Sequence, residues 1–187
     1  MRNTLLVALL LTAPSIAFAQ GYSQGSDHTG GGCGPGKTQF EVKTTKSRPA
    51  TAQPPDGKAL VYVIQTAWRE PGLTVIGSQR PVTRVGLDGS WVGANHGDSY
   101  ITFTVDPGSH SICTDWQSAF SQRSDLASAA DLEAEAGGTY YFRVKVRDSD
   151  SDGQHHNRGV VNIELVDASE GRLLLGNSEF ATSTPKK

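Results

Sequence analysis

Residues 83–114, TRVGLDGSWVGANHGDSYITFTVDPGSHSICT, decide the fold because they specify strands and turns directly. Asp88-Gly89 and Pro107-Gly108 are turn dipeptides, since glycine takes positive φ without a Cβ clash and proline presets φ for a turn. Between these turns, residues 100–105 are all β-branched or aromatic. In an extended segment they alternate between two faces, with Tyr100, Thr102 and Thr104 on one and Ile101, Phe103 and Val105 on the other. We therefore predict three short strands joined by two turns, which form a small antiparallel meander.

The same stretch carries a resemblance to a known family. Its motif residues are Leu87-Asp88-Gly89, Val92-Gly93, Tyr100, Val105, Pro107-Gly108, His110 and Ile112. They resemble the pattern of PEGA-like domains and of a related uncharacterised family of bacterial secreted proteins and lipoproteins, with weaker similarity over residues 58–63, 140–144 and 164–167. The resemblance implies an all-β fold, a single small antiparallel β-sandwich of the carboxypeptidase-regulatory kind. It also implies an accessory module without catalytic residues.

The N-terminal residues 1–19 have the parts of a secretory signal peptide. Arg2 precedes an apolar run over residues 5–11, and Ala17-Phe18-Ala19 supplies the small residues of a cleavage site before Gln20. A membrane anchor is the alternative, but the run is shorter than the roughly 20 residues of a spanning helix. We expect a mature protein that is secreted or periplasmic.

The charge balance argues against nucleic acid as a partner. The whole chain of 187 residues has 17 basic and 19 acidic residues, and cleavage removes only Arg2, so 16 basic residues remain and the net charge becomes −3. Binding to nucleic acid needs an excess of cations against phosphates. We expect an envelope protein or a glycan as partner, and no membrane span after cleavage.

Cys33 and Cys113 are the two cysteines of the chain, and both remain after cleavage. Disulfides persist outside the cytoplasm, so we expect the two to pair. Lipidation of Cys33 and two free thiols are the alternatives. If Ile112 faces the core, Cys113 faces outward. The disulfide would then hold the N-terminal leader against the outer face of the sheet.

Composition divides the remaining chain into a leader, a domain and a tail. Residues 20–57 are rich in glycine and proline and read as a flexible leader, in which residues 38–44 could add an edge strand. Residues 58–175 form the predicted β-sandwich domain: residues 59–65 are its core strand, Gly137-Gly138 its hairpin, and residues 167–175 a short C-terminal helical turn on a sheet edge. Residues 176–187 are the C-terminal tail, expected to be disordered from residue 182.

An acidic segment offers a candidate metal site. Asp148, Asp150 and Asp152 match the first half of a D-x-D-x-D-G calcium loop, but Gly159 stands where a bidentate glutamate should close it. The plainer interpretation is a solvated hairpin loop, so we expect no cofactor there. His155-His156 follows directly, and neighbouring residues on an extended chain point to opposite faces.

Aromatic residues offer a candidate ligand platform, and scattered polar residues a weaker catalytic hypothesis. Trp68, Trp91, Trp116 and Tyr100 could form a surface for a glycan or peptide, although core packing is the commoner fate of such residues. A hydrolase would need a pocket around His96, Asp98 and Asp115, and no hydrolase or metalloprotease motif is present. We predict a non-catalytic module with an interaction or structural role in the cell envelope or extracellular space.

Overall fold

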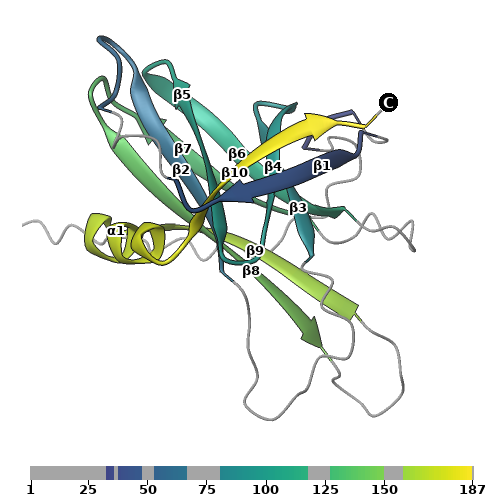
Figure 1. Cartoon of the computed structure of the whole chain (residues 1–187). Coiled ribbons are helices and arrows are strands. Elements are labelled where there is room, and N and C mark those ends of the chain that lie inside the picture. Colours follow the sequence, from purple (N-terminus) through teal and green to yellow (C-terminus); the bar gives the residue numbers. More distant parts are fainter. Residues whose placement is uncertain are drawn as a thin grey trace, which may run out of the picture.

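The protein is a two-sheet β structure with one short helix, described here from a computed structural model that covers residues 33–35, 38–47, 53–66, 81–117, 127–149 and 158–186 (Figure 1). The elements, in chain order, are β1 (Phe40–Thr45), β2 (Ala59–Thr66), β3 (Val82–Leu87), β4 (Ser90–His96), β5 (Ser99–Val105), β6 (Gly108–Gln117), β7 (Ala127–Ala134), β8 (Thr139–Ser149), β9 (Arg158–Val166), α1 (Ala168–Gly176) and β10 (Glu179–Pro185). The predicted all-β, sandwich-like fold with a short C-terminal helix is confirmed.

The ten described strands form one six-stranded and one four-stranded sheet. The six-stranded sheet has the order β1-β10-β5-β2-β8-β9, and the four-stranded sheet has the order β4-β3-β6-β7. Most neighbouring strands are antiparallel, as predicted. Two pairs, β2 with β8 and β5 with β10, are parallel. Parallel pairs need connections that leave the sheet, and here the four-stranded sheet and α1 supply them.

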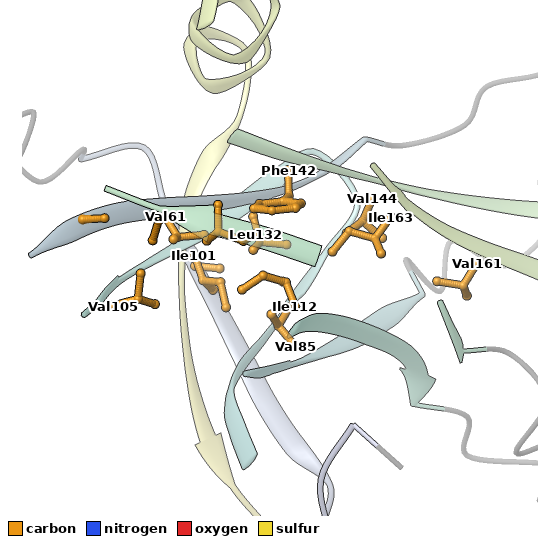
Figure 2. Packing of buried hydrophobic residues seen from close by; sticks show 14 of the residues in the cluster. Val61, Val85, Ile101, Val105, Ile112, Leu132, Phe142, Val144, Val161 and Ile163 are labelled. Atoms are coloured by element: carbon orange, nitrogen blue, oxygen red, sulfur yellow. The ribbon is translucent and has the colours of Figure 1, made fainter. Parts of the chain in front are cut away.

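Strand β2 is the central strand, as its continuous apolar sequence predicts. One face, with Val61 and Val63, packs in the core between the two sheets, where Phe142, Ile112 and Leu132 also lie (Figure 2). The other face, with Leu60, Tyr62 and Ile64, packs in a second cluster with side chains of α1. Both faces of β2 are therefore covered.

The stretch 83–114 contains four strands, so the predicted three-stranded meander is wrong. An additional turn at Gly97-Asp98, where Asp98 has φ of 59°, separates β4 from β5. Strand β5 then leaves for the six-stranded sheet, and β6 returns to pair with β3. Turn residues indicate that the chain reverses, but they do not indicate which sheet the next strand joins.

The turn at Gly137-Gly138 also connects the two sheets, so the predicted hairpin is wrong. Strand β7 pairs with β6, whereas β8 pairs with β2 and β9. Gly137 has φ of 79°, and its N–H donates to the carbonyl of Lys58 at 2.8 Å. The N–H of Leu60 donates to the carbonyl of Gly138 at 2.9 Å. The turn is therefore held by the start of β2.

Two serines join the sheets where their edges approach each other. Ser183 Oγ of β10 accepts a hydrogen bond from the N–H of Ala94 in β4 at 3.0 Å. On the other side, Ser128 Oγ of β7 accepts one from the N–H of Ile163 in β9 at 3.2 Å. These contacts satisfy N–H groups on strands that would otherwise present open edges.

The domain extends beyond the predicted range 58–175 at both ends. Strand β1 pairs with β10 along its whole length, and the two lie side by side in Figure 1. Lys186 continues the ladder, since its N–H donates to the carbonyl of Gln39 at 2.7 Å. The prediction of a disordered tail from residue 182 is therefore wrong. The edge strand suggested for residues 38–44 is present as β1, and its partner is a segment with few apolar residues.

Helix α1 covers a face of the six-stranded sheet rather than an edge. The Asp167 carboxylate caps its first turn by accepting hydrogen bonds from the N–H groups of Ser169 and Glu170. Gly171 packs so closely on the ring of Tyr141 that a Cβ atom would overlap it. The Arg143 guanidinium binds Glu170 of the helix and Glu164 of β9. The predicted helical turn is confirmed, and its packing explains why Tyr141 is buried.

Candidate functional site

The candidate site lies on the outer face of the four-stranded sheet, where the segment before β1 crosses it. We call residues 33–35 and 38–39 the strap. Cys33 and Cys113 lie at disulfide distance, with Cα atoms 5.4 Å apart, and Cys33 is buried. Cys113 is on β6 and points away from the core, next to the fully buried Ile112. The strap thus lies over the outer face, as the alternation of β6 predicts.

Gly86 of β3 provides room for the start of the strap. A Cβ atom on this glycine would overlap the carbonyl oxygen of Cys33. Gly86 also follows the irregularity in the β3–β4 register between Val85 and Gly86. Bulges twist a strand locally and change where its side chains point. The missing side chain and the bulge together let the strap backbone lie directly on the sheet.

Trp91 of β4 is held between the strap and an arginine. A Cβ atom on Gly34 would lie 2.6 Å from the indole ring, so only glycine fits there. The indole N–H donates to the carbonyl of Pro35 at 3.0 Å. The Arg84 guanidinium carbon lies 4.5 Å from the centre of the indole ring, in a cation–π arrangement. Trp91 therefore contacts the strap through its ring and its N–H.

Arg84 connects the sheet to the strap. Its Nε lies 2.7 Å from Asp115 Oδ1, and its Nη2 binds the other carboxylate oxygen, so the pair is bidentate. Its Nη1 donates to the carbonyl of Thr38 at 2.5 Å. The two charges are largely shielded from solvent, with the Arg84 side chain 12% exposed. Such a pair fixes the guanidinium plane, which in turn orients the third donor.

Gln117 at the end of β6 holds the strap where it becomes β1. Its Oε1 accepts a hydrogen bond from the N–H of Phe40 at 2.6 Å, and its Nε2 donates to the carbonyl of Phe40 at 2.8 Å. The side-chain amide thus pairs with β1 as a neighbouring strand would. Contacts to the strap therefore run along the outer face from Cys113 to Gln117.

The predicted aromatic platform does not form among the residues that the structure describes. Tyr100 is buried in the cluster under α1, 6.0 Å from Tyr62 between ring centres. Trp116 packs against the main core, while Trp91 lies under the strap. Trp68 falls outside the described residues. The three platform residues that the structure describes therefore lie in three separate parts of the fold.

The predicted calcium ligands fall mostly outside the described part of the chain. Asp150 and Asp152 are not described, and neither is His155-His156. The backbone of Asp148 belongs to β8, opposite Gly159 of β9. Elsewhere in the described ranges, no group of three or more histidine, cysteine, aspartate or glutamate side chains is placed to hold a metal ion.

The residues proposed for a hydrolase site do not join into one cluster. Asp115 lies on β6 and binds Arg84 of β3, whereas His96 is at the end of β4, and β3 lies between β4 and β6. The His96 Nδ1 atom lies 3.3 Å from the carbonyl of Gly97. Asp98 is the second residue of the Gly97-Asp98 turn after β4 and has positive φ. No hydrogen bond or ion pair between His96 and Asp115 is present in this described region.

A second network of ion pairs lies on the outer face of the six-stranded sheet, under α1, and holds parts of the fold together. Glu164 accepts from Lys145 at 2.7 Å and from Arg143 Nε at 2.7 Å. These contacts lower the pKa of Glu164, the hydrogen bond from Lys145 first and those from Arg143 next. The network ties β8, β9 and α1 together. Its charges therefore hold the helix on the sheet.

Sequence reasoning missed Arg84, Gly86 and Gln117 as parts of the strap site. Their partners lie 46, 53 and 77 residues earlier in the chain, so no local pattern reports the contacts. The cysteine pair was the one usable signal, because it predicted that the leader reaches β6. Arginine beside a tryptophan-bearing strand has no distinctive spacing of its own.

Comparison with known proteins adds no assignment. No family model, no curated protein and no solved structure matches the chain. Within the described residues, none of the helices is long and apolar enough to cross a membrane.

Proposed function

We propose that this chain is a non-catalytic β-sandwich module of the bacterial envelope or extracellular space, exported by its signal peptide and related to PEGA-like domains. One observation carries the proposal: the charged side chains of the two ion-pair networks described above hold parts of the fold together. Arg84 and Asp115 hold the strap, and Arg143 and Glu164 hold α1. Charges committed in this way give a rigid surface, which suits an interaction or structural role.

Export and retention in the envelope test the first half of this proposal. N-terminal sequencing of the protein from the periplasm or culture medium should give a mature chain that begins at Gln20. The oxidised mature protein should then bind saturably to isolated cell envelopes. A chain that keeps residues 1–19 and stays in the cytoplasm would contradict the proposed location.

Incubation with envelope polymers tests the second half. The purified protein should release no soluble fragments from peptidoglycan or envelope polysaccharide. Fragment release that disappears in an Asp115→Asn variant would favour the alternative, a hydrolase. Saturable binding to a purified glycan would favour the other alternative, a glycan-binding module, and Trp68→Ala would test the one platform residue that the structure leaves undescribed.

A further inference from the structure

We propose that the strap site is a recognition site for a peptide segment with a Gly-Pro pair, filled by the chain's own Gly34-Pro35 while the disulfide is intact. When Cys33 and Cys113 are thiols, the site accepts the Gly-Pro segment of a partner protein. This inference rests on the proposed interaction role and gives it a partner class. The inference follows from the hydrogen bonds of the site, because Arg84 and Trp91 bind backbone carbonyls of the strap rather than its side chains.

Two side chains of the sheet donate to backbone carbonyls of the strap. Trp91 Nε1 donates to Pro35 and Arg84 Nη1 to Thr38, at 3.0 and 2.5 Å. A carbonyl is present at every residue of any peptide. These contacts are therefore available to a segment of different sequence, provided that its backbone follows the same path.

The site still requires particular residues at two positions. Glycine is required where Gly34 lies, because a Cβ atom would come within 2.6 Å of the indole. Proline suits the next position, because it carries no N–H that needs a partner. The Pro35 carbonyl also accepts a hydrogen bond from the N–H of Thr38 at 3.3 Å, which closes a turn in the segment. Aromatic grooves that bind proline-containing segments are a recurring mode of peptide recognition. A Gly-Pro pair is thus the ligand that the indole selects.

The sheet residues of the site are held by contacts with one another as well as by the strap. Asp115 fixes Arg84 through two hydrogen bonds, and Arg84 lies against the Trp91 ring. All three belong to the four-stranded sheet. A preformed site loses less free energy on ordering when a ligand binds. The indole should therefore keep its position after the strap leaves.

The disulfide controls access because it ties the strap at its second end. With β1 holding the other end, the strap competes with any partner at an effective concentration in the millimolar range or above. A dithiol reductant that transfers two electrons and two protons, and is itself oxidised to a disulfide, converts Cys33 and Cys113 to thiols. The strap is then tied at one end only and can be displaced.

A full-length variant with an emptied site tests the proposal directly. Cys33→Ser and Cys113→Ser remove the disulfide, and Gly34→Val excludes the strap from the indole. The probe is the capped peptide Ser-Gly-Pro-Gly-Lys-Thr-Gln, which copies residues 33–39 with serine for cysteine. We expect saturable binding by isothermal titration calorimetry, at least tenfold tighter than to the oxidised wild type.

Two controls define the result. Trp91→Phe in the emptied variant removes the indole N–H and should weaken peptide binding at least tenfold, whereas Trp116→Phe should not. A probe with alanine in place of the first glycine, which copies Gly34, should also bind at least tenfold more weakly. Absence of saturable binding to an emptied variant with a β-type circular dichroism spectrum, or equal binding of both probes, overturns the proposal.

A second measurement does not depend on the triple variant. Full-length Cys33→Ser and Cys113→Ser proteins are mixed under mild oxidation, so that each can supply the cysteine that the other lacks. If the site accepts a strap from another chain, a Cys33–Cys113 cross-linked heterodimer should form faster than either homodimer. Equal rates overturn the proposal. Envelope binding of the oxidised wild type is measured separately, so its failure would count against the proposed function and not against this site.

Discussion

His110 Nδ1 lies 2.7 Å from Asp88 Oδ2, an ion pair that joins β6 to the turn between β3 and β4. The other ring nitrogen, Nε2, lies 2.8 Å from the carbonyl oxygen of Asp106. Both partners accept hydrogen bonds, so only the doubly protonated imidazolium donates to both. The second carboxylate oxygen of Asp88 accepts from the N–H of Ser111 at 2.9 Å. This arrangement holds two neighbouring turns together.

The pair predicts a defined pH dependence of stability. The hydrogen bond with Asp88 raises the pKa of His110 above its ordinary value of 6.5, and the hydrogen bond with His110 lowers the pKa of Asp88 below 3.8. The His110 contribution is complete below pH 6.5 and is lost as pH rises through the folded-state pKa. The Asp88 contribution is complete above pH 3.8 and is lost as pH falls through its folded-state pKa. The pair therefore stabilises most between about pH 4 and 6.5.

Replacing the imidazole tests this dependence. His110→Gln should lower the Tm by a few degrees near pH 5, and the difference should shrink toward pH 9 and toward pH 2. Thermal unfolding of both proteins across this range is the measurement. His96→Gln is the matched control, because the His96 contact is to a backbone carbonyl. A Tm difference that stays constant across the range would count against an imidazolium at position 110.

The Cys33–Cys113 pair predicts a covalent link between the two cysteines. Peptide mapping without reduction should recover the two cysteine peptides joined, and both cysteines should resist alkylation. Cys113→Ser should lower the Tm, because the sequence separation of 80 closes a long loop. Chain entropy puts the effect at up to about 4 to 5 kcal/mol, or roughly 10 to 20 °C for a chain of this size. Two alkylatable thiols would contradict the pairing.

Strands β1 and β10 predict that both ends of the chain are needed for a stable domain. Strand β10 lies between β1 and β5, so removing residues 177–187 removes the strand with which both β1 and β5 pair. Removing residues 1–57 takes β1, with the buried Phe40 and with Val42, which packs on the core. Each truncation should lower the Tm by at least 10 °C in circular dichroism melts, whereas removing residues 1–32 should not. An unchanged melt after loss of β10 would show that this pairing contributes little.

The contrast between β2 and β10 explains how much of the fold could be predicted. Strand β2 was predicted because both of its faces are apolar, which records burial on both sides. Strand β10, with the sequence EFATSTP, has few apolar residues, and its partner β1 is 139 residues away at the Thr182–Lys43 contact. The local sequence pattern indicates which strands are buried and where turns occur. It does not indicate which distant strands pair, because that pairing depends on the topology of the whole fold. The strap site was missed for the same reason.

The acidic segment between β8 and β9 yields a test with added calcium. Asp148 and Gly159 are opposite each other in the β8–β9 ladder, so the position expected for a closing glutamate is a strand glycine. We expect millimolar calcium to leave the Tm unchanged. Extracellular sites can be as weak as about 10⁻³ M, so the titration should reach 10 mM, well above that dissociation constant. A rise of several degrees that Asp150→Ala abolishes would make this a calcium-dependent module.

Thr83 is the centre of a buried polar network between the sheets. Its Oγ1 lies 2.8 Å from Gln65 Oε1 and 2.9 Å from Asn95 Oδ1, and all three side chains are fully buried. The Asn95 amide donates to the carbonyl of Val63 at 3.0 Å, and the Gln65 amide donates to the carbonyl of Pro81 at 2.9 Å. The NH₂ groups of both side-chain amides therefore donate to backbone carbonyls. Their oxygens point to the Thr83 hydroxyl.

Removing the Thr83 hydroxyl should therefore destabilise the protein more than its size suggests. Thr83→Val keeps the shape but removes the single hydroxyl proton that the Gln65 and Asn95 oxygens share, so one buried amide oxygen loses its donor. An unsatisfied group of this kind costs about 1 to 3 kcal/mol. For a chain of this length, that corresponds to a fall in Tm of roughly 2 to 10 °C. Thr83→Ser keeps the hydroxyl and loses one methyl group, so it should be the milder change. If thermal unfolding showed the valine variant to be as stable as the serine variant, the hydroxyl would not be what holds Gln65 and Asn95 between the sheets.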